Sequence, residues 1–457
     1  MKGFMKEQGL YVKAGAWYLL GNAVIKGILY YFVFVFTRLM SAGEYGLYST
    51  YLVYENLLTS VMGLGLAQTV KPAWLAFQDR LSSYMKTAAL CTLASGGIFF
   101  LFFWVFRTQI QSSVKMDLVV CLFIWGNALC NCFYFLMSQK SVAENKYRKY
   151  IFIEFFRSVP QLFLAYYLIK FSGTIGGFEA RLAGHTLPLM LIGAVCLVAF
   201  LRKGTAGKEY VTYGISMGLP LIIVGLSQTI LSQSDQLVIR AFWGDEGTGF
   251  YAAIGYVGSI LYVIMLSIQN VWDPWFYRAI SGMKKEDGGQ EARPVSSENR
   301  EAGYREMDAS ALAAKVRMVG LVFAVPVCLM MLAGPKLASI FLAPEYHQAI
   351  RLIYPLSAGW MFQFLGALIM NMEYAQKKTG YASVGIILGA CINLGLNYAL
   401  VPVYGYEAAA WTTLIAHAAI FFWHLAVDRL VIKSGMFSLK SMGLILLPVC
   451  LLLFILL

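Results

Sequence analysis

The chain is dominated by apolar stretches of roughly 20 residues, each long enough as an α-helix to cross a hydrocarbon layer about 30 Å thick. Its 457 residues are 59% hydrophobic and only 13% charged, whereas about a quarter of a soluble domain is charged. Backbone groups inside lipid must be paired within their own segment, so such spans are helical. The stretches cover residues 14–37, 46–70, 86–106, 118–138, 151–170, 184–201, 213–241, 250–277, 316–333, 350–372, 382–402 and 406–427. The sequence therefore predicts an all-α, polytopic membrane protein of about twelve helices, with residues 442–457 as a possible thirteenth.

The basic residues are distributed unequally between the two sides of the predicted membrane. When the loops are numbered alternately, most of the 36 Lys and Arg residues fall on the side that carries the N-terminus. The positive-inside rule therefore predicts a cytoplasmic N-terminus. It also accounts for the net charge of +12 without nucleic acid as a partner.

The cysteines predict neither a disulfide framework nor a metal site. All eight lie in apolar stretches, where a thiol behaves as a small hydrophobic group. Cys130 and Cys132 are separated by one residue, a spacing that matches no metal-binding motif. We expect no metal.

The longest polar stretch runs from Ser281 to Ser310 and mixes charges of both signs. This composition is typical of a disordered loop, here on the cytoplasmic side. A solvated insertion between two helices explains it, and a regulatory or partner-binding role stays open.

Two junctions between predicted helices resemble each other. Residues Thr37 to Tyr54 read TRLMSAGEYGLYSTYLVY, and residues Ile239 to Val257 read IRAFWGDEGTGFYAAIGYV; both give Arg, an acidic-glycine turn and then a glycine with aromatic residues. Chance similarity between apolar segments is the alternative to a repeat. Because six spans separate the copies, a true repeat would have a pseudo-two-fold axis along the membrane normal. The chain is then divided into six-helix lobes at 1–208 and 209–438, followed by 439–457, an arrangement suited to alternating access.

Ionisable groups inside a predicted span are functional candidates because burying them in lipid costs several kcal/mol. Lys26 and Glu55 lie in consecutive helices at matching depths of roughly 16 and 14 Å from the outer end, at about 1.5 Å per residue. An ion pair between them is one interpretation, and attraction of an anionic head group by Lys26 is the other. Asn22 lies four residues before Lys26, on the same helical face.

Further polar candidates lie in other spans. Glu154 and Arg157 are three residues apart, so an intrahelical pair is the first interpretation and a substrate role for Arg157 the second. Asp235 lies near the outer end of its span and is a candidate for ion coupling. Asn393 and Asn397 share a face; interhelical hydrogen bonds are the commoner use of such residues, and substrate contact is the alternative.

Several stretches resemble the polysaccharide transporter, or oligosaccharide flippase, family, a branch of the superfamily that includes multidrug and toxin extrusion transporters and lipid II flippases. They are RLMSAGEYGLYS (Arg38 to Ser49), DQLVIRAFWGDEGTGFYAAIGYV (Asp235 to Val257), QNVWDPWFY (Gln269 to Tyr277), APEYHQA (Ala343 to Ala349) and NLGLNYALVPVYGYEAAAWTT (Asn393 to Thr413). Asp273 departs from the small polar residue more usual at its position. The resemblance implies two six-helix lobes and the flipping of undecaprenyl-diphosphate-linked oligosaccharides across a bacterial inner membrane.

The family has no simple catalytic signature, so site residues must come from physical reasoning. A diphosphate crossing a medium of low dielectric constant requires cations, which favours Lys26 and Arg157. Glu55 is the candidate for pairing with Lys26 or for coupling to protons or sodium. The resemblance implies lipid-linked oligosaccharide and membrane lipids as ligands, and a polysaccharide polymerase or glycosyltransferase as possible partners.

Two alternatives remain open. Export of cationic drugs would require an anionic cavity, which Glu55 and Glu154 could supply only if Lys26 and Arg157 turned away. A membrane-embedded glycan polymerase would require a large external loop, and the predicted outer loops are short. No Gly-rich phosphate loop or catalytic triad is present, so we expect a non-enzymatic transporter without cofactors, driven by an ion gradient.

Overall fold

The computed structural model describes residue 21 and residues 24–144, 146–283 and 309–456. The elements in these ranges are helical, and nine helical segments among them are long and apolar enough to cross a membrane. The predicted all-α, polytopic class is therefore confirmed. Asn22 and residues 284–308 of the predicted cytoplasmic loop lie outside the described residues.

The chain divides into two compact units, Met1–Ala252 and Ala253–Leu457. This division falls later than the predicted lobe boundary at residue 208, because the helix that begins at Lys208 makes hydrogen bonds to α2 of the first unit. The described helices of the first unit begin with residues 24–39 and continue through α2 (Ala42–Met62), α3 (Val70–Phe77), η1 (Gln78–Arg80), α4 (Leu81–Val105), α5 (Arg107–Val114), α6 (Leu118–Ala143), α7 (Tyr147–Ser158), α8 (Pro160–Phe171), α9 (Gly177–Leu201) and most of α10 (Lys208–Gly258).

The second unit is also helical throughout its described residues. Its elements are α11 (Ile260–Met283), α12 (Ala309–Phe341), η3 (Pro344–Leu352), α13 (Ile353–Ala375), α14 (Thr379–Tyr404), α15 (Tyr406–Val427), the π-helical turn η4 (Asp428–Ile432) and α16 (Leu439–Leu456). The possible thirteenth span therefore forms a helix, α16, and it meets the length and apolarity needed to cross a membrane.

Two predicted spans are interrupted, and a glycine lies between two further predicted spans that join in one helical element. The predicted span 151–170 is split into α7 and α8 at Pro160, whose ring nitrogen cannot donate. Within the predicted span 46–70, α2 ends at Met62, and a turn that contains Gly65 (φ 65°) separates α2 from α3. Gly244 (φ 72°) separates the two halves of α10, in the left-handed region that glycine occupies without a steric penalty.

The start of α2 is held by a capping box that also reaches a second helix. Ser41 Oγ accepts a hydrogen bond from the backbone nitrogen of Glu44, and the Ser41 nitrogen donates to Glu44 Oε2 at 2.9 Å. The other carboxylate oxygen, Oε1, accepts from the backbone nitrogen of Gly177 at 2.7 Å, at the first residue of α9. One side chain therefore satisfies exposed donors at the N-termini of two helices.

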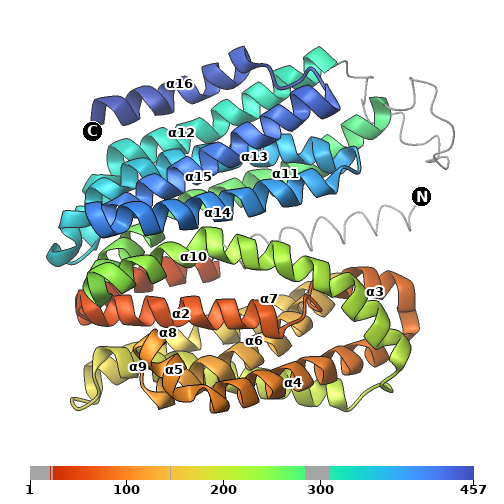
Figure 1. The fold of residues 1–457 in the computed structure, drawn as a ribbon, viewed down its shortest axis with the longest axis vertical. Coiled ribbons are helices and arrows are strands. Elements are labelled where there is room, and N and C mark those ends of the chain that lie inside the picture. Colours follow the sequence, from red (N-terminus) through yellow and green to blue (C-terminus); the bar gives the residue numbers. More distant parts are fainter. Residues whose placement is uncertain (1–20, 22–23, 145, 284–308, 457) are drawn as a thin grey trace. The chain divides into compact units, whose positions relative to one another are not determined.

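Each unit is organised around a central pair of helices. In the first unit α6 packs against α2, α3, α4, α7 and α9, and close approach of α6 and α9 requires Gly193, where a Cβ would lie 2.5 Å from that of Cys130. In the second unit α13 and α15 pack along each other, with α12, α14 and α16 around them (Figure 1). The polar side chains of interest lie between these packed helices.

Candidate functional site

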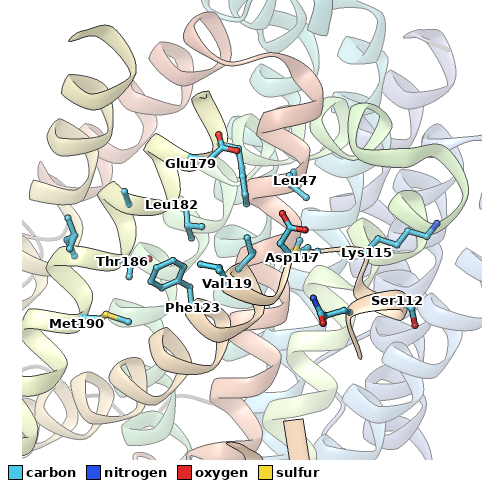
Figure 2. A pocket seen from close by; sticks show the side chains of 16 residues that line it. Leu47, Ser112, Lys115, Asp117, Val119, Phe123, Glu179, Leu182, Thr186 and Met190 are labelled. Atoms are coloured by element: carbon cyan, nitrogen blue, oxygen red, sulfur yellow. The ribbon is translucent and has the colours of Figure 1, made fainter. Parts of the chain in front are cut away.

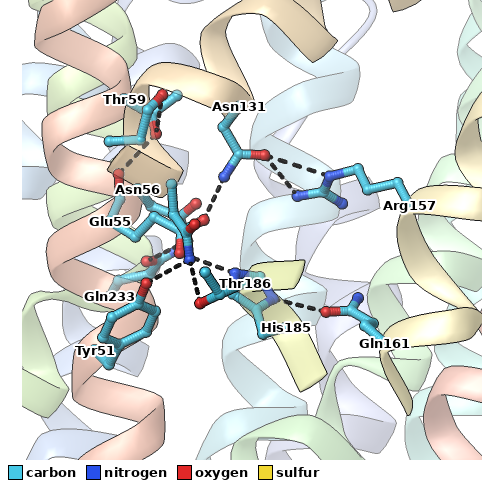
Figure 3. Close-up of polar contacts among 12 residues, drawn as sticks. Tyr51, Glu55, Asn56, Thr59, Asn131, Arg157, Gln161, His185, Thr186 and Gln233 are labelled. Atoms are coloured by element: carbon cyan, nitrogen blue, oxygen red, sulfur yellow. Dashed lines mark hydrogen bonds and ion pairs between the residues drawn. The ribbon is translucent and has the colours of Figure 1, made fainter. Parts of the chain in front are cut away.

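A chain of polar side chains runs through the interior of the first unit and joins α2, α6, α7, α8 and α9 (Figure 3). At its centre Glu55 of α2 is 1% exposed. Its carboxylate accepts a hydrogen bond from Asn131 Nδ2 of α6 through Oε1, and its Oε2 lies 2.9 Å from His185 Nε2 of α9. A buried carboxylate is stable only with such partners.

His185 lies between two oxygen acceptors. Its Nε2 faces Glu55, and its Nδ1 lies 2.6 Å from Oε1 of Gln161 on α8. Both ring nitrogens can donate at once only in the imidazolium form, whereas the neutral ring requires one of them to accept. Rotation of the Gln161 amide would present its NH₂ group to Nδ1 instead. This arrangement can therefore exchange a proton without losing its hydrogen bonds.

Asn131 connects the buried carboxylate to a cation. Its amide nitrogen donates to Glu55, while its amide oxygen accepts from Arg157 of α7, at 3.3 Å from Nε and 3.1 Å from Nη2. The guanidinium carbon of Arg157 also lies 4.6 Å from the centre of the Tyr134 ring, within cation–π range. Arg157 is only partly buried, so this linkage joins the interior to the surface of the unit.

Lys26 and Glu154 lie at the same end of this linkage as Arg157. Glu154 accepts a hydrogen bond from the Tyr134 hydroxyl. Lys26, on the first described helix, is exposed, and Glu154 and Arg157 are the charged groups that act on it. Two cations and one carboxylate therefore gather on one face of the first unit.

Two ion pairs that the sequence left open as interpretations do not form among the described residues. Glu55 pairs with His185 and not with Lys26, because equal depth in neighbouring helices does not make two side chains face each other. Within the described residues Glu154 and Arg157 do not form an intrahelical pair: Glu154 bonds to Tyr134, and Arg157 bonds to Asn131. Both side chains find partners on α6 instead of on their own helix.

Polar groups also connect α2 to α10. Ser49 Oγ donates to Gln236 Oε1 at 2.6 Å, and Asn56 Nδ2 donates to Gln233 Oε1 at 3.2 Å. Asp235, on the same stretch of α10, is buried and accepts from the Tyr251 hydroxyl. Its predicted role in ion coupling stays a prediction.

The two copies of the sequence repeat meet at their matched glycines. A Cβ on Gly46 would overlap the carbonyl oxygen of Asp245 and lie 2.6 Å from the nitrogen of Gly249. Only residues without a side chain allow α2 and α10 to approach this closely. The repeated Gly-aromatic pattern therefore has a packing role in the first unit.

Asn393 and Asn397 of α14 are both fully buried in the second unit. Asn397 Nδ2 donates to Asn393 Oδ1 at 3.1 Å, and Thr412 of α15 donates to Asn397. Asn393 Nδ2 lies 3.3 Å from Thr413 Oγ1. The contacts with α15 are hydrogen bonds between helices, which is the commoner use expected for such residues. A substrate contact of the pair stays a prediction.

A cavity of 880 Å³ opens in the first unit between the α5–α6 turn and α9 (Figure 2). Its lining is mainly apolar, with Lys115, Asp117 and Glu179 among the charged residues. It contains none of the predicted site residues. One lining residue, Thr186, has a hydroxyl 3.0 Å from Asn127 Nδ2, and Asn127 also donates to the Tyr51 hydroxyl of α2.

Sequence reasoning missed His185, Gln161 and Asn131, which complete the buried chain. All three lie inside predicted spans, so a search for every polar residue within a span would have found them. The chain has only four histidines, which makes His185 the easiest of the three to notice. In the described residues no three His, Cys, Asp or Glu side chains gather in a way that could hold a metal ion.

Comparison with known proteins gives one family match and one curated relative. The family described as polysaccharide biosynthesis protein matches residues 11–280, more than half of the chain. An uncharacterized membrane protein of Methanocaldococcus jannaschii is 29% identical over 125 residues, which span 27% of this chain and 24% of that protein. The match thus covers about a quarter of the length of the curated relative.

Solved structures with similar folds are transporters and flippases. The lipid II flippase MurJ, in an inward closed conformation, has a TM-score of 0.70 at 12% identity, over 96% of this chain and 91% of that one. An inward-facing multidrug resistance MATE family transporter has a TM-score of 0.63 at 13% identity, over 91% and 96%. A MOP superfamily transporter from Pyrococcus furiosus, with a binding pocket of reverse polarity, has a TM-score of 0.60 at 14% identity, over 94% and 96%. At these identities the similarity shows the fold, and the family match adds the relationship: the chain belongs to the polysaccharide biosynthesis protein family and has the polytopic fold of MATE and MurJ transporters.

Proposed function

We propose that this protein is a flippase that moves undecaprenyl-diphosphate-linked oligosaccharide repeat units from the cytoplasmic to the outer leaflet of a bacterial inner membrane, with its N-terminus in the cytoplasm. Transport would proceed by alternating access and supply a pathway of cell-surface polysaccharide biosynthesis, in which a polymerase or glycosyltransferase is a possible partner. The family and the fold of the chain support a lipid-linked substrate.

The observation that carries the proposal is the pair of cations on one face of the first unit. Lys26 is exposed, and Arg157 is partly exposed and held by Asn131. Glu154 offsets one of the two positive charges. A net positive face inside the membrane favours an anionic group such as a diphosphate, because charge interactions are much stronger there than in water.

The same geometry disfavours export of cationic drugs. That function would require an accessible anionic cavity, but Glu55 is 1% exposed and its carboxylate is already paired with His185 and Asn131. Glu154 is the remaining acidic candidate, and the cations Lys26 and Arg157 lie beside it. A drug exporter is therefore the second candidate, and a glycan polymerase is less favoured than either.

Coupling to an ion gradient is assigned to Glu55 and His185. An imidazole and a carboxylate 2.9 Å apart can share and release a proton. Asn131 would connect this pair to Arg157, so binding of an anion at Arg157 would alter the hydrogen bonding of Glu55. Proton coupling is proposed over sodium coupling for this reason.

The test is depletion of the protein in its native cell, followed by radiolabelling and leaflet-specific accessibility of lipid-linked sugars. We expect single repeat units to accumulate facing the cytoplasm. Units trapped on the outer face would indicate a polymerase or ligase, and no accumulation would favour drug export.

Complementation with Lys26→Ala should fail although the variant is folded and in the membrane. Lys71→Ala, which removes an exposed lysine of α3, is the matched control and should complement. Wild-type transport by Lys26→Ala would contradict the assignment. Arg157→Ala should weaken substrate affinity by about 10- to 100-fold, since one charge-assisted hydrogen bond contributes about 1.5–3 kcal/mol.

A further inference from the structure

The 880 Å³ cavity of the first unit is charged at one end and apolar at the other (Figure 2). Lys115 and Asp117 of the α5–α6 turn and Glu179 in the first turn of α9 line the charged end. Phe123 of α6 and Met190 of α9 line the apolar end. Because α6 and α9 both begin at the charged end, the cavity follows the two helices inward from their N-termini.

The cavity lies where α6 and α9 separate after a close contact. The two helices approach closely where a Cβ on Gly193 would lie 2.5 Å from that of Cys130. About one turn nearer their N-termini, a Cβ on Gly126 would lie 3.1 Å from Met190 Cε. Met190 also lines the cavity, so this contact closes its apolar end.

The cavity is about as deep as one leaflet of a bilayer. Met190 follows Glu179 by about three turns of α9, which is roughly 16 Å at about 5.4 Å per turn. Half of a hydrocarbon core about 30 Å thick is roughly 15 Å. Val119 and Leu187 on the two walls are 60% and 59% exposed, and both belong to helices apolar enough to cross a membrane. The opening between these walls therefore faces lipid.

The charged side chains at the open end have no partner within the described part of the chain. Lys115, Asp117 and Glu179 form no side-chain hydrogen bond or ion pair there. Asp117 is the N-cap residue of α6 but makes no capping hydrogen bond. One positive and two negative charges are thus free to bind a ligand, and together they carry a net charge of −1.

This set of charges favours a zwitterionic lipid that carries a primary amine. An ammonium group can donate hydrogen bonds to the carboxylates of Asp117 and Glu179. A phosphate is favoured beside Lys115 and the uncapped N-terminus of α6. An anionic lipid without an amine would meet two carboxylates and one lysine, which disfavours its negative charge. A choline head group carries the positive charge but has no N–H group to donate.

We propose that this cavity binds one molecule of phosphatidylethanolamine from the leaflet on the side of the α5–α6 turn. An acyl chain would lie between α6 and α9, with the head group at Lys115, Asp117 and Glu179. The bound lipid would connect the turn before α6 to the first turn of α9 and stabilise the first unit by mass action. Binding does not depend on the transported substrate; only the identity of this leaflet as the outer one rests on the proposed orientation.

The test measures lipid binding to the purified full chain by native mass spectrometry, after removal of lipid in detergent. Phosphatidylethanolamine, phosphatidylglycerol and phosphatidylcholine with the same acyl chains compete in equal amounts. We expect one bound lipid per chain, with phosphatidylethanolamine preferred over phosphatidylglycerol by roughly tenfold. Added phosphatidylethanolamine should also raise the melting temperature more than either of the other two lipids.

Two kinds of variant test the head group and the location separately. The double variant Asp117→Asn with Glu179→Gln changes the net charge of the open end from −1 to +1, so it should prefer phosphatidylglycerol. Asp79→Asn removes an exposed carboxylate of η1 outside the cavity and should keep the wild-type preference. Ala183→Phe places a ring in the cavity and should abolish binding of all three lipids. Val195→Phe, at an exposed position of α9 outside the lining, is its control.

Equal binding of phosphatidylethanolamine and phosphatidylglycerol by the wild type would overturn the proposal. An unchanged preference in the double variant would do the same, because the carboxylates would then not read the head group. Wild-type lipid binding by Ala183→Phe would place the lipid elsewhere; if this variant does not fold, Ala183→Met provides the same comparison. A preference for undecaprenyl phosphate over phosphatidylethanolamine would show that the cavity takes a substrate-like lipid and would contradict the site proposed here.

Discussion

The carboxylate of Glu55 and the imidazole of His185 meet at 2.9 Å inside the first unit, although 130 residues separate them in the chain. Neither side chain has appreciable contact with solvent. Glu55 also accepts a hydrogen bond from Asn131, and Asn131 in turn accepts one from the partly exposed Arg157. A buried pair of a carboxylate and an imidazole is thus connected to a partly exposed cation.

Glu55→Gln should remove proton exchange while it preserves the shape of the side chain and most of its hydrogen bonds. We expect transport to become independent of an imposed pH gradient and to fall about tenfold or more, with a folded protein. Transport in proteoliposomes, with and without the gradient, is the measurement. A gradient-driven rate equal to that of the wild type would falsify the coupling role of Glu55.

His185→Ala should instead destabilise the protein, because Glu55 would stay buried with one fewer partner. Removing one member of a buried ion pair costs about 3–5 kcal/mol. The loss should appear as a lower melting temperature of the purified protein. His347→Ala, at an intermediate-burial histidine of η3, is a comparison that should cost clearly less.

Asn131 and Arg157 should behave as one functional element. Asn131→Leu removes the amide that joins Arg157 to Glu55, so we expect its effect on transport to resemble that of Arg157→Ala. The transport rate of the double variant should lie within about threefold of the rate of either single variant, because the effects of substitutions in one hydrogen-bond network are not additive. Transport rates of the three variants form the double-mutant cycle, and additive losses would show that the two residues act separately.

Glu44→Ala should cost more stability than its exposure suggests. Its carboxylate closes the capping box of α2 and accepts from the first residue of α9, and loss of one helix cap typically costs about 1 kcal/mol. We therefore expect about 1–2 kcal/mol, measured by thermal unfolding. Glu179→Ala removes an exposed acidic residue from the first turn of α9 and should change stability by about 0.5 kcal/mol or less. Equal effects of the two substitutions would argue against the double cap.

Two arginine ion pairs should differ sharply in their contribution to stability. The Arg240 side chain is 9% exposed; it contacts Asp245 at 2.6 Å and the carbonyl oxygens of Val114 and Lys115 at 2.6 and 3.1 Å. Arg240→Ala should therefore cost about 2–4 kcal/mol, because the α5–α6 turn loses its donor. Arg80 pairs with Glu209, but the two side chains are 63% and 55% exposed. Arg80→Ala should cost at most about 1 kcal/mol in the same unfolding measurement.

The sequence by itself determined the class of the protein, because hydrophobicity over about 20 residues is a local property of composition. It also identified Lys26, Glu154 and Arg157, which do lie near one another, since a charged residue inside an apolar span stands out regardless of how the helices pack. Gly46 and Gly249 were visible as matching positions of the repeat before their contact was known.

The tertiary structure decided which partner each polar group has, because helical periodicity gives the face of a residue but not the rotation of one helix against another. Glu55 faces His185 of α9 and not the lysine at equal depth, and Arg157 faces α6 instead of Glu154 on its own helix. The contact between Glu373 and His424 likewise depends on α13 and α15 packing along each other. Contacts between residues far apart in the chain follow from the packing of whole helices, which no local pattern in the sequence specifies.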